Sequence, residues 1–371
     1  MAAVIDLHCD TVKFLSEGID LRKPNPAGHV DLPRLRRGGV GLQVFAAYVA
    51  PSTAEEQAFS AAMGMLDRIG EFAASDPLLR PVETAEESSR VMKAGKTGIL
   101  KAVENGWAIE DSLDKLEELR RQKVRIMTLV HSRHTHWAAS CTGETAFPPT
   151  GAAPENHGGG LSPFGEKVIA AMNDLGIMVD LSHGAESTFW DAVKLSKKPI
   201  IASHSCAYEL CASPRNLKDD QLKALGDARG VVGVCFFPTF LNDAYRKALD
   251  AEGGNIFRQM GTIEKQFAND PAGLLAEREK FEARMTELLK ENPVPFTVIA
   301  DHIDYIVKLA GEDAIALGSD FDGIYSLPTG VTGCDFYPLL EEELRRRSYT
   351  AEQITKFFSA NFLRVFREHD R

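Results

Sequence analysis

Ile177-Met-Val-Asp-Leu-Ser-His183 and Pro199-Ile-Ile-Ala-Ser-His-Ser205 are two mostly apolar stretches of the same form, and each has a histidine at or beside its end. Short, nearly continuous apolar runs of this kind predict strands that are buried on both faces, as the strands of a parallel sheet are. Helical sequence separates the two stretches. We therefore expect two consecutive parallel strands that each present a histidine at the carboxyl end.

Further runs of this form occur on both sides of these two. Helical patterns lie between most of them; Ser162-Pro163, for example, supplies an N-cap and a proline for the first helical position. Eight buried strands that alternate with helices predict an α/β protein with a (β/α)8 TIM barrel rather than a sandwich. The other six runs are Val4–Asp10, Val40–Val49, Gly98–Glu104, Arg125–Ser132, Val231–Phe237 and Ala314–Asp320.

Two segments are longer than a connection between barrel elements needs. Residues from about 238 to 295 contain an amphipathic pattern from Leu274 to Leu289, which predicts a helical insertion between strands 7 and 8 of a single domain spanning residues 1–371. The charged residues there are expected to form a solvated face, with a homodimer contact as the alternative. The loop from Cys141 to Leu161 is rich in Gly, Pro and Thr, and loops of this length often act as lids or binding loops.

Composition and charge exclude some classes of partner. The 371 residues are 44% hydrophobic, which suits a sizeable core, and the net charge of -11 without a basic stripe argues against nucleic acid as a partner. No apolar run approaches the ~20 residues of a membrane span, and neither end resembles a signal peptide or a lipid-anchor signal. The six cysteines form no CxxC pair, so we expect cytoplasmic thiols and no membrane partner; an exported protein with disulfides is the alternative.

Polar side chains stand at the ends of most of the predicted strands. In a barrel of parallel strands all carboxyl ends open on the same face, where enzymes of this fold place their active sites. We therefore expect the ends of six separate runs to converge on one cavity. The residues are His8 and Asp10, Glu104, His131, His183, His204 and Asp320.

The types of these residues predict a metal centre. His8 and Asp10 are two apart on a strand and so point to the same face, where a nitrogen and an oxygen can bind one cation at about 2.0–2.2 Å. A surface pair is the alternative for this triplet. His183 and His204 end neighbouring strands, which lie about 4.8 Å apart, so both imidazoles can reach a single ion.

Glu104 is expected to join these two pairs of ligands. A carboxylate has two oxygens and can bridge two cations about 3.5 Å apart, whereas the alternative is a rim glutamate paired with a basic residue. Imidazole and carboxylate ligands without thiolate favour Zn²⁺ over Mn, Co or Fe. We predict two zinc ions per chain, bridged by Glu104.

The remaining polar residues suit catalysis and substrate binding. Asp320 can take a proton from the metal-bridging water and pass it to a leaving amine, with Asp322 as its local competitor. His131 can stabilise charge on a carbonyl oxygen, and Arg215 can hold a carboxylate in bidentate fashion unless it forms a rim salt bridge. Cys9 should face away from the ligands because side chains alternate along a strand.

Several motifs in consistent order, from about Ile5 to Phe366, resemble the membrane (renal) dipeptidase family, zinc-dependent dipeptidases of the amidohydrolase-type barrels. The long insertion is closer to bacterial members than to animal ones. The motifs are Asp-Leu-His8-Cys-Asp10-Thr, Val-Glu104-Asn-Gly, Leu-Val-His131-Ser, Gly-Leu-Ser-Pro-Phe-Gly (160–165), Asp-Leu-Ser-His183, Ser-His204-Ser, Arg215-Asn and Gly-Ser-Asp320-Phe-Asp-Gly.

The resemblance implies a binuclear zinc dipeptidase that cleaves L-Xaa-L-Xaa and L-Xaa-D-Xaa dipeptides by attack of a metal-bridging hydroxide. By this resemblance, His131 contacts the scissile carbonyl oxygen and Arg215 binds the C-terminal carboxylate of the substrate. Asp320 transfers the proton. The ligands it implies are His8 and Asp10 for the first zinc, Glu104 for both, and His183 and His204 for the second.

The chain also departs from the family pattern. The mammalian members are exported and disulfide-bonded. Cys211 matches a family cysteine, but this sequence has no cysteine at the place after run seven where a disulfide partner is expected. Phe240 stands where some members have an aromatic hydroxyl, so carboxylate binding would depend more on Arg215.

Two other functions stay open at this stage. One is a different metal hydrolase of the same barrel type, acting on N-acyl amino acids, lactams or lactones, because fold and metal ligands do not determine the substrate. The matches at Arg215 and His131 disfavour it. The other is a catalytically inactive binding protein, which the complete set of ligands and Asp320 disfavours.

Overall fold

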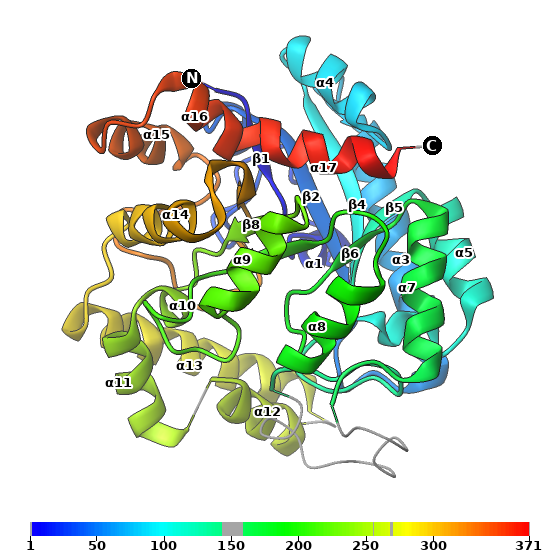
Figure 1. Ribbon diagram of the computed structural model, residues 1–371. Coiled ribbons are helices and arrows are strands. Elements are labelled where there is room, and N and C mark those ends of the chain that lie inside the picture. Colours follow the sequence, from blue (N-terminus) through cyan, green and yellow to red (C-terminus); the bar gives the residue numbers. More distant parts are fainter. Residues whose placement is uncertain (1, 143–158, 255, 268–269, 371) are drawn as a thin grey trace.

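A ring of eight parallel strands forms the centre of the protein (Figure 1). The structure is a computed structural model that describes residues 2–142, 159–254, 256–267 and 270–370. Each strand pairs in parallel with the next, and β1 pairs with both β2 and β9, so the ring is closed. This confirms the predicted (β/α)8 TIM barrel. The strands are β1 (Val4–Asp6), β2 (Val40–Tyr48), β4 (Thr97–Glu104), β5 (Val124–Thr128), β6 (Met178–Asp180), β7 (Ile201–Ser205), β8 (Val231–Val234) and β9 (Ile315–Leu317).

Each predicted run overlaps one of these strands. β4 and β5 begin one residue before their runs, and several of the other strands are shorter than the runs. β6 ends at Asp180 and β9 at Leu317, whereas the runs continue to His183 and Asp320. Both of these residues have a positive φ, 66° and 62°, and left-handed backbone cannot continue a ladder. A further short strand, β3 (Leu79–Pro81), pairs with β4 outside the ring and was not predicted.

Helices surround the ring, as the alternating pattern predicts. α7 begins where the sequence indicates, because the Ser162 hydroxyl accepts from the Gly165 N–H, and it ends at Gly176 with φ 71°. The helices outside the insertion are α1 (Val12–Ser16), α2 (Leu32–Arg37), α3 (Glu55–Ala74), η1 (Gly106–Ile109), α4 (Ala85–Lys93), α5 (Leu113–Arg121), α7 (Pro163–Leu175), α8 (Glu186–Leu195), α9 (Asp219–Asp227), α14 (Thr297–Ala310), η2 (Glu312–Ala314), α15 (Tyr337–Arg346), α16 (Ala351–Thr355), η3 (Lys356–Ala360) and α17 (Asn361–His369).

Helix α17 closes the amino-terminal end of the barrel. It runs across the barrel in Figure 1 and buries Phe362 and Phe366 in one core cluster with Met178, Ile201 and Val231, each of which is the first residue of its strand. Burying an aromatic or aliphatic side chain of this size contributes about 1.5–3 kcal/mol. The opposite, carboxyl end of the barrel is therefore the end that is free to hold a site.

The predicted helical insertion between the seventh and eighth barrel strands is confirmed. In Figure 1, α11 to α13 lie together at the end of the molecule opposite α17. α13 buries Phe281, Met285 and Leu288, in agreement with the amphipathic pattern, although it is longer than the predicted helix. The insertion consists of α10 (Pro238–Leu241), α11 (Asp243–Gly253), α12 (Ile256–Gln266) and α13 (Pro271–Glu291).

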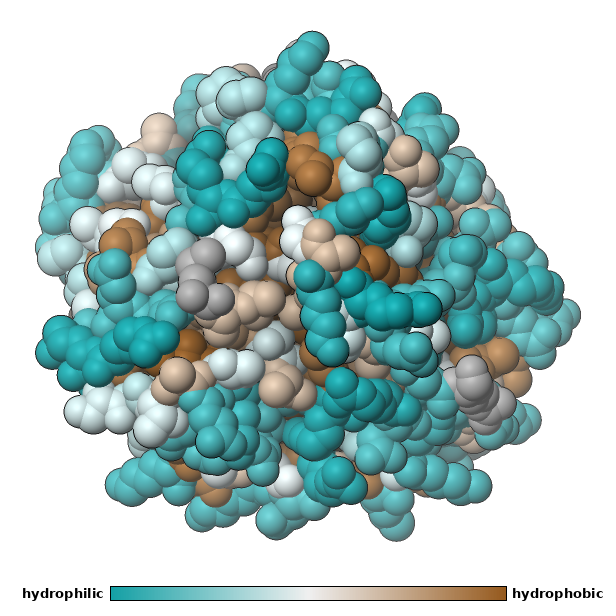
Figure 2. All heavy atoms as spheres, turned by 90° about the horizontal axis from the view of Figure 1, so that it is seen from above, coloured by the Kyte–Doolittle hydropathy of each residue, from teal (hydrophilic) through white to brown (hydrophobic). Residues whose placement is uncertain are grey.

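The surface and the thiols carry few special features. Figure 2 shows a face that is mostly hydrophilic, with hydrophobic residues in the recesses, and Leu339 is the one large hydrophobic side chain exposed within the described residues. All six cysteines are free thiols. Among the described residues, every helix is too short or too polar to cross a membrane. Most of the loop between Cys141 and Leu161, which the sequence suggests as a lid, lies outside the described residues.

Candidate metal centre

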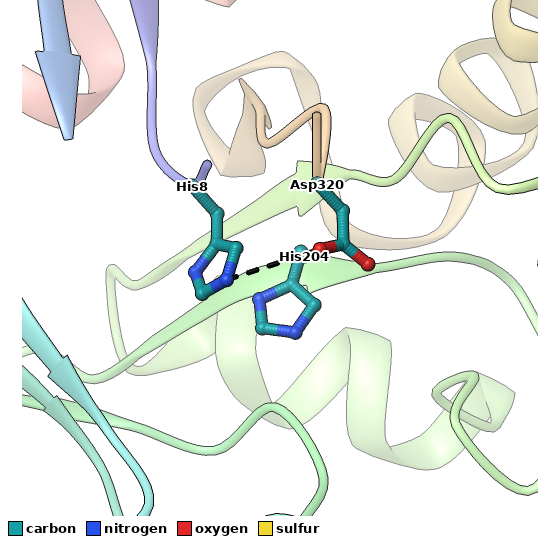
Figure 3. A group of neighbouring side chains, drawn as sticks. All are labelled: His8, His204 and Asp320. Atoms are coloured by element: carbon teal, nitrogen blue, oxygen red, sulfur yellow. Dashed lines mark ion pairs between the residues drawn. The ribbon is translucent and has the colours of Figure 1, made fainter. Parts of the chain in front are cut away.

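The five expected metal ligands lie together at or just beyond the carboxyl ends of their strands. His8 and Asp10 follow β1, Glu104 ends β4, His183 follows β6 and His204 belongs to β7. They form overlapping groups whose ligand atoms lie within 4.8 Å of one another, and all but the half-buried Asp10 are buried. Figure 3 shows one of these groups, in which His8, His204 and Asp320 approach one another from separate segments of the chain.

The two oxygens of Glu104 face different pairs of ligands. Its Oε2 lies 3.6 Å from His8 Nε2, which is 3.7 Å from Asp10 Oδ2. Its Oε1 lies 3.1 Å from His183 Nε2 and 3.6 Å from His204 Nε2. Two ligands of a tetrahedral zinc with bonds of about 2.0–2.1 Å are separated by about 3.3 Å. The arrangement therefore fits two ions with Glu104 between them.

Unpaired polar atoms inside this cluster also fit a cation. His8 Nε2 and Asp10 Oδ1 are buried and have no hydrogen-bond partner among the described residues. A buried polar atom without a partner is costly, and native structures keep such atoms where a ligand satisfies them. The donor set of imidazoles and carboxylates is the set that divalent zinc prefers.

The electrostatics of the cluster favour the metal-binding form of the histidines of the second pair. Burial, with smaller contributions from neighbouring cationic groups such as Arg215, lowers the pKa values of His183 and His204 well below the usual value. Both imidazoles are therefore neutral at pH 7, and the neutral ring is the form that binds metal.

Two carboxyl groups of the cluster have raised pKa values. Burial and then Asp10 raise the pKa of Glu104, and burial, Asp10 and Glu104 raise the pKa of Asp320 well above its usual value against the opposing effect of His8. Burial lowers the pKa of His8, but Glu104 and Asp10 outweigh it and raise that pKa well above normal. A crowded set of negative charges in a dry site is unfavourable unless a cation compensates it, and divalent ions do so.

His131 lies beside the cluster rather than within a ligand group. Its ring is 4.1 Å from that of His183 and 4.7 Å from that of Tyr48, and its Nδ1 lies 3.1 Å from the Ser132 hydroxyl. Burial lowers the pKa of His131 to about 3, so the ring is neutral. A neutral ring whose Nδ1 accepts from Ser132 carries its proton on Nε2 and can donate it.

Arg215 is a buried guanidinium that lies beside the centre. Its Nη2 donates to the His204 carbonyl at 3.0 Å and its Nη1 to the Ser205 hydroxyl at 3.5 Å, whereas its Nε is buried and has no hydrogen-bond partner among the described residues. Within the part of the chain that the structure describes, no carboxylate lies within salt-bridge distance of it, so the alternative of a rim salt bridge is not found there. The guanidinium lies 5.3 Å from the centre of the Phe240 ring. Arg215 therefore has donor capacity for an anionic ligand.

Asp322 and Cys9 have other partners. The Asp322 carboxylate accepts from the Thr11 hydroxyl and from the His29 N–H, both at 2.6 Å. The Cys9 thiol donates to the Val44 carbonyl at 3.3 Å, and it is in none of the ligand groups found among the described residues. The Cys9 contact agrees with the expectation that Cys9 is not a ligand. Asp322, the competitor of Asp320 for proton transfer, has both oxygens occupied by Thr11 and His29.

A cavity of about 90 Å³ opens onto the cluster. Several residues that line this cavity are not predicted from the sequence. Tyr48 ends β2, so the rule that polar residues at strand ends face the site, which identifies Glu104, applies to it as well. Nothing in the sequence indicates that α12 covers the site with Ile256 and Met260. A larger cavity of about 550 Å³ shares His183 with the first and reaches Arg215. The small cavity is lined by Asp10, Tyr48, Glu104, His131, Ser132, His183, Phe237, Phe240, Ile256, Met260, Gly261, Asp320, Gly323, Ile324 and Tyr325.

Comparison with known sequences gives a match over the whole chain. Residues 1–371 match the family described as membrane dipeptidase, peptidase family M19. Among curated proteins, Dipeptidase 3 of Macaca fascicularis is 30% identical over 340 residues, which are 92% of this chain and 58% of that protein. The chain thus spans 58% of the length of the curated relatives it matches.

Comparison with solved structures gives the same barrel. A metallo peptidase from Rhodobacter sphaeroides, liganded with a phosphinate mimic of the dipeptide L-Ala-D-Ala, superposes with a TM-score of 0.79 at 25% identity and covers 100% of this chain and 99% of its own. A metallo peptidase named dipeptidase AC superposes with a TM-score of 0.78 at 26% identity, covering 99% and 98%.

Proposed function

Because the chain belongs to the membrane dipeptidase family, peptidase family M19, we propose that it is a dipeptidase that hydrolyses L-Xaa-L-Xaa and L-Xaa-D-Xaa dipeptides with two zinc ions. The observation that carries the proposal is the position of Glu104, whose two oxygens face two separate pairs of ligands. The dipeptide mimic bound to the Rhodobacter relative, with its D-residue in second place, supports this class of substrate.

The proposed ligands follow from the distances around Glu104. His8 and Asp10 would hold one ion, His183 and His204 would hold the other, and Glu104 lies where it would contribute to both. Zinc supplies Lewis acidity and a water molecule that is nucleophilic at neutral pH. The neutral state of His183 and His204 supports this assignment. His8 Nε2 and Asp10 Oδ1, which have no hydrogen-bond partner in the described part of the chain, support it as well.

Asp320 is the proposed proton carrier. It lies in the cluster, with Oδ1 3.9 Å from His8 Nε2, and it lines the small cavity. A carboxylate in this place takes the proton of the attacking water and returns it to the nitrogen of the leaving amine. Asp322 is not suited to this role because its oxygens already accept from Thr11 and His29.

The substrate is held at its two polar groups. His131 donates from Nε2 to the scissile carbonyl oxygen, where negative charge grows during attack. Arg215 holds the terminal carboxylate with the donor capacity that its acceptors among the described residues, the His204 carbonyl and the Ser205 hydroxyl, leave open. The cation–ring contact with Phe240 supports the guanidinium from one side.

One assay tests the proposal. The zinc-reconstituted protein is incubated with a library of dipeptides that carry both stereochemistries at the second residue, and release of free amino acids is measured. Activity should disappear with a chelator and return with zinc. A metal-loaded protein that cleaves none of the L,L or L,D substrates would overturn the proposal. The cytoplasmic location and the homodimer contact stay predictions.

A further inference from the structure

Two buried aspartates bind the strand ends next to them in the same way. Asp180 at the end of β6 accepts the Ser182 and Ser203 N–H groups on Oδ1, at 3.1 and 2.8 Å, and the Ser203 hydroxyl on Oδ2 at 2.6 Å. We call this arrangement the Asp180 clamp. It joins β6 to β7 at the residue that precedes His204.

Asp6 at the end of β1 repeats the pattern. Its Oδ1 accepts the His8 and Ser319 N–H groups at 3.3 and 2.8 Å, and its Oδ2 accepts the Ser319 hydroxyl at 2.6 Å. This Asp6 clamp joins β1 to the segment after β9, at the residue that precedes Asp320. Both aspartates have no exposed surface. The two clamps are therefore matched in chemistry and burial.

The clamps differ in their contact with a histidine ring. The Ser203 oxygen also lies 2.8 Å from Nδ1 of His204, whereas the Ser319 oxygen has no imidazole among its contacts in the described residues. Only the Asp180 clamp can therefore act on the ring of a proposed metal ligand.

Counting protons gives the direction of each bond. Ser203 has one hydroxyl proton, and the Asp180 carboxylate only accepts, so the short contact to Oδ2 uses that proton. The Ser203 oxygen must then accept from His204, whose Nδ1 carries the ring proton. The other lone pair of the Ser203 oxygen faces the Ser182 hydroxyl at 3.2 Å. The Ser182 oxygen accepts the backbone N–H of His204 at 3.0 Å, so the Ser182 hydroxyl proton is free to be donated to Ser203.

We propose that Asp180 is a positioning residue that acts through Ser203 to hold His204 in the tautomer with the proton on Nδ1, so that Nε2 presents its lone pair to the second metal ion. The inference rests on the proposed function because it takes His204 as a ligand. The Nε2 atom faces Glu104 Oε1 at 3.6 Å and His183 Nε2 at 3.0 Å, as a ligand to an ion between them would. Metal-bound histidines commonly have the ring nitrogen that does not bind metal fixed by such a partner.

The variant Asp180→Asn reverses the direction of the hydrogen bond between residue 180 and the Ser203 hydroxyl without changing the shape of the side chain. An amide oxygen in place of Oδ1 still accepts the two N–H groups, but the NH₂ group donates to Ser203 and to the Thr128 hydroxyl, which lies 2.5 Å from Oδ2. The Ser203 proton then has His204 Nδ1 as its nearest acceptor. The ring shifts to the tautomer protonated on Nε2, and Nε2 then has no lone pair for the metal ion.

The matched control is Asp6→Asn. It makes the same substitution at an equally buried clamp, but Ser319 can turn its proton to the His8 carbonyl at 3.3 Å, and no imidazole responds. We expect Asp180→Asn to weaken zinc binding at one site by about 10- to 100-fold, the range typical of such supporting residues, and Asp6→Asn to change it by no more than about threefold.

Two measurements on the zinc-free and zinc-titrated proteins decide the question. Competition with a chromogenic chelator gives the zinc affinities, and long-range ¹H–¹⁵N NMR of histidine-labelled protein gives the His204 tautomer. Unchanged affinity or an unchanged tautomer in Asp180→Asn would overturn the inference. A wild-type protein that binds no zinc would instead refute the proposed function, and the tautomer would still test the clamp.

A second pair of variants covers the case in which Asp180→Asn does not fold. Ser203→Ala removes the acceptor of the His204 ring proton, and Ser319→Ala removes the matching hydroxyl of the other clamp. The inference requires a mixed His204 tautomer and weaker zinc binding in Ser203→Ala alone. Equal effects of the two alanine variants on zinc affinity would show a general loss of structure and contradict it.

Discussion

His183 and Asp320 hold left-handed backbone although neither is glycine, and each lies just beyond the end of a barrel strand. Such a conformation costs about 1–2 kcal/mol per residue, so it persists only where the surrounding structure determines it. At both positions the strand has ended three residues earlier, and the side chain belongs to the ligand cluster. The strain at His183 and Asp320 therefore lies at residues whose geometry the proposed site needs to be fixed.

Arg215 offers a test at the level of one side chain. Replacement by alanine should raise KM for dipeptides and lower kcat/KM by about 30- to 200-fold, because a charge-assisted pair with the substrate carboxylate is worth about 2–3 kcal/mol. Steady-state kinetics against a dipeptide and its C-terminal amide measure this, and the amide should lose far less.

Arg215→Lys is the control for charge without the fork of two donors. It should recover only part of the loss because an ammonium group cannot bind a carboxylate in bidentate fashion. If Arg215→Ala cleaved dipeptides as well as the wild type does, a different substrate, such as a lactam or lactone, would become the better proposal.

At the scale of elements, the strands that were predicted are those that the barrel buries on both sides. Runs such as Gly98–Glu104 are mostly apolar because every residue of β4 except the half-buried Lys101 is buried, and this signal is strong enough to find all eight ring strands. β3 was missed because three residues ending in Pro81 carry no period. The early ends of β6 and β9 were missed because left-handed backbone at non-glycine residues leaves no trace in the sequence.

The candidate site divides in the same way. The groups that end strands could be predicted because their spacing and their place in a parallel barrel bring them to one face. The apolar wall over them could not, since the amphipathic period of α12 shows which face is apolar but not what that face covers. Ile256 and Met260 can therefore be assigned to the site only from the position of the insertion on the barrel.

Helix α12 should influence which side chains the site accepts. Met260 lines the small cavity together with Phe237 and Phe240, so Met260→Glu places a charge in an apolar wall. We expect kcat/KM to fall at least about tenfold for dipeptides with aliphatic side chains and much less for Gly-Gly, since one apolar contact is worth about 1–3 kcal/mol. Gln266→Glu at the exposed end of the same helix is the control. An equal loss for all substrates would show that α12 has no part in selection.

Helix α14 carries a buried histidine that should make stability depend on pH. His302 accepts the Ala207 N–H on Nδ1 at 3.1 Å and donates from Nε2 to the Leu241 carbonyl at 2.9 Å, and burial lowers its pKa to about 4 against small opposing effects of Leu241 and Asp301. The unfolded chain, with a pKa near 6.5, binds the proton first as pH falls. Stability from this group is complete above about pH 6.5 and is lost toward pH 4, by about 3 kcal/mol at most.

Urea unfolding of zinc-free protein between pH 7 and pH 4 measures the effect of His302. His302→Gln should be less stable than the wild type at pH 7, and the difference should shrink as the wild type loses its contribution in acid. A difference that stayed constant over this range would show that His302 does not titrate as proposed.

At the scale of the whole molecule, the insertion is connected to the barrel through buried contacts. The Tyr245 hydroxyl of α11 lies 3.2 Å from the Met285 carbonyl of α13 and 3.3 Å from the Ser326 hydroxyl in the segment after β9. The rings of Phe281 and Tyr325 pack edge to face at 5.7 Å. The segment that carries Asp320 therefore leads directly into the contacts that hold the insertion.

These contacts predict that the insertion and the barrel unfold together. Calorimetry of the zinc-loaded chain should show one cooperative transition, and removal of zinc should lower its midpoint, because zinc at 1,000 times its dissociation constant stabilises the native state by about 4 kcal/mol per site. Limited proteolysis provides the control, since a single domain should give no folded barrel that lacks residues 238–295. Two separate transitions would contradict the single domain. A midpoint that a chelator leaves unchanged would contradict the stabilisation of the fold by zinc.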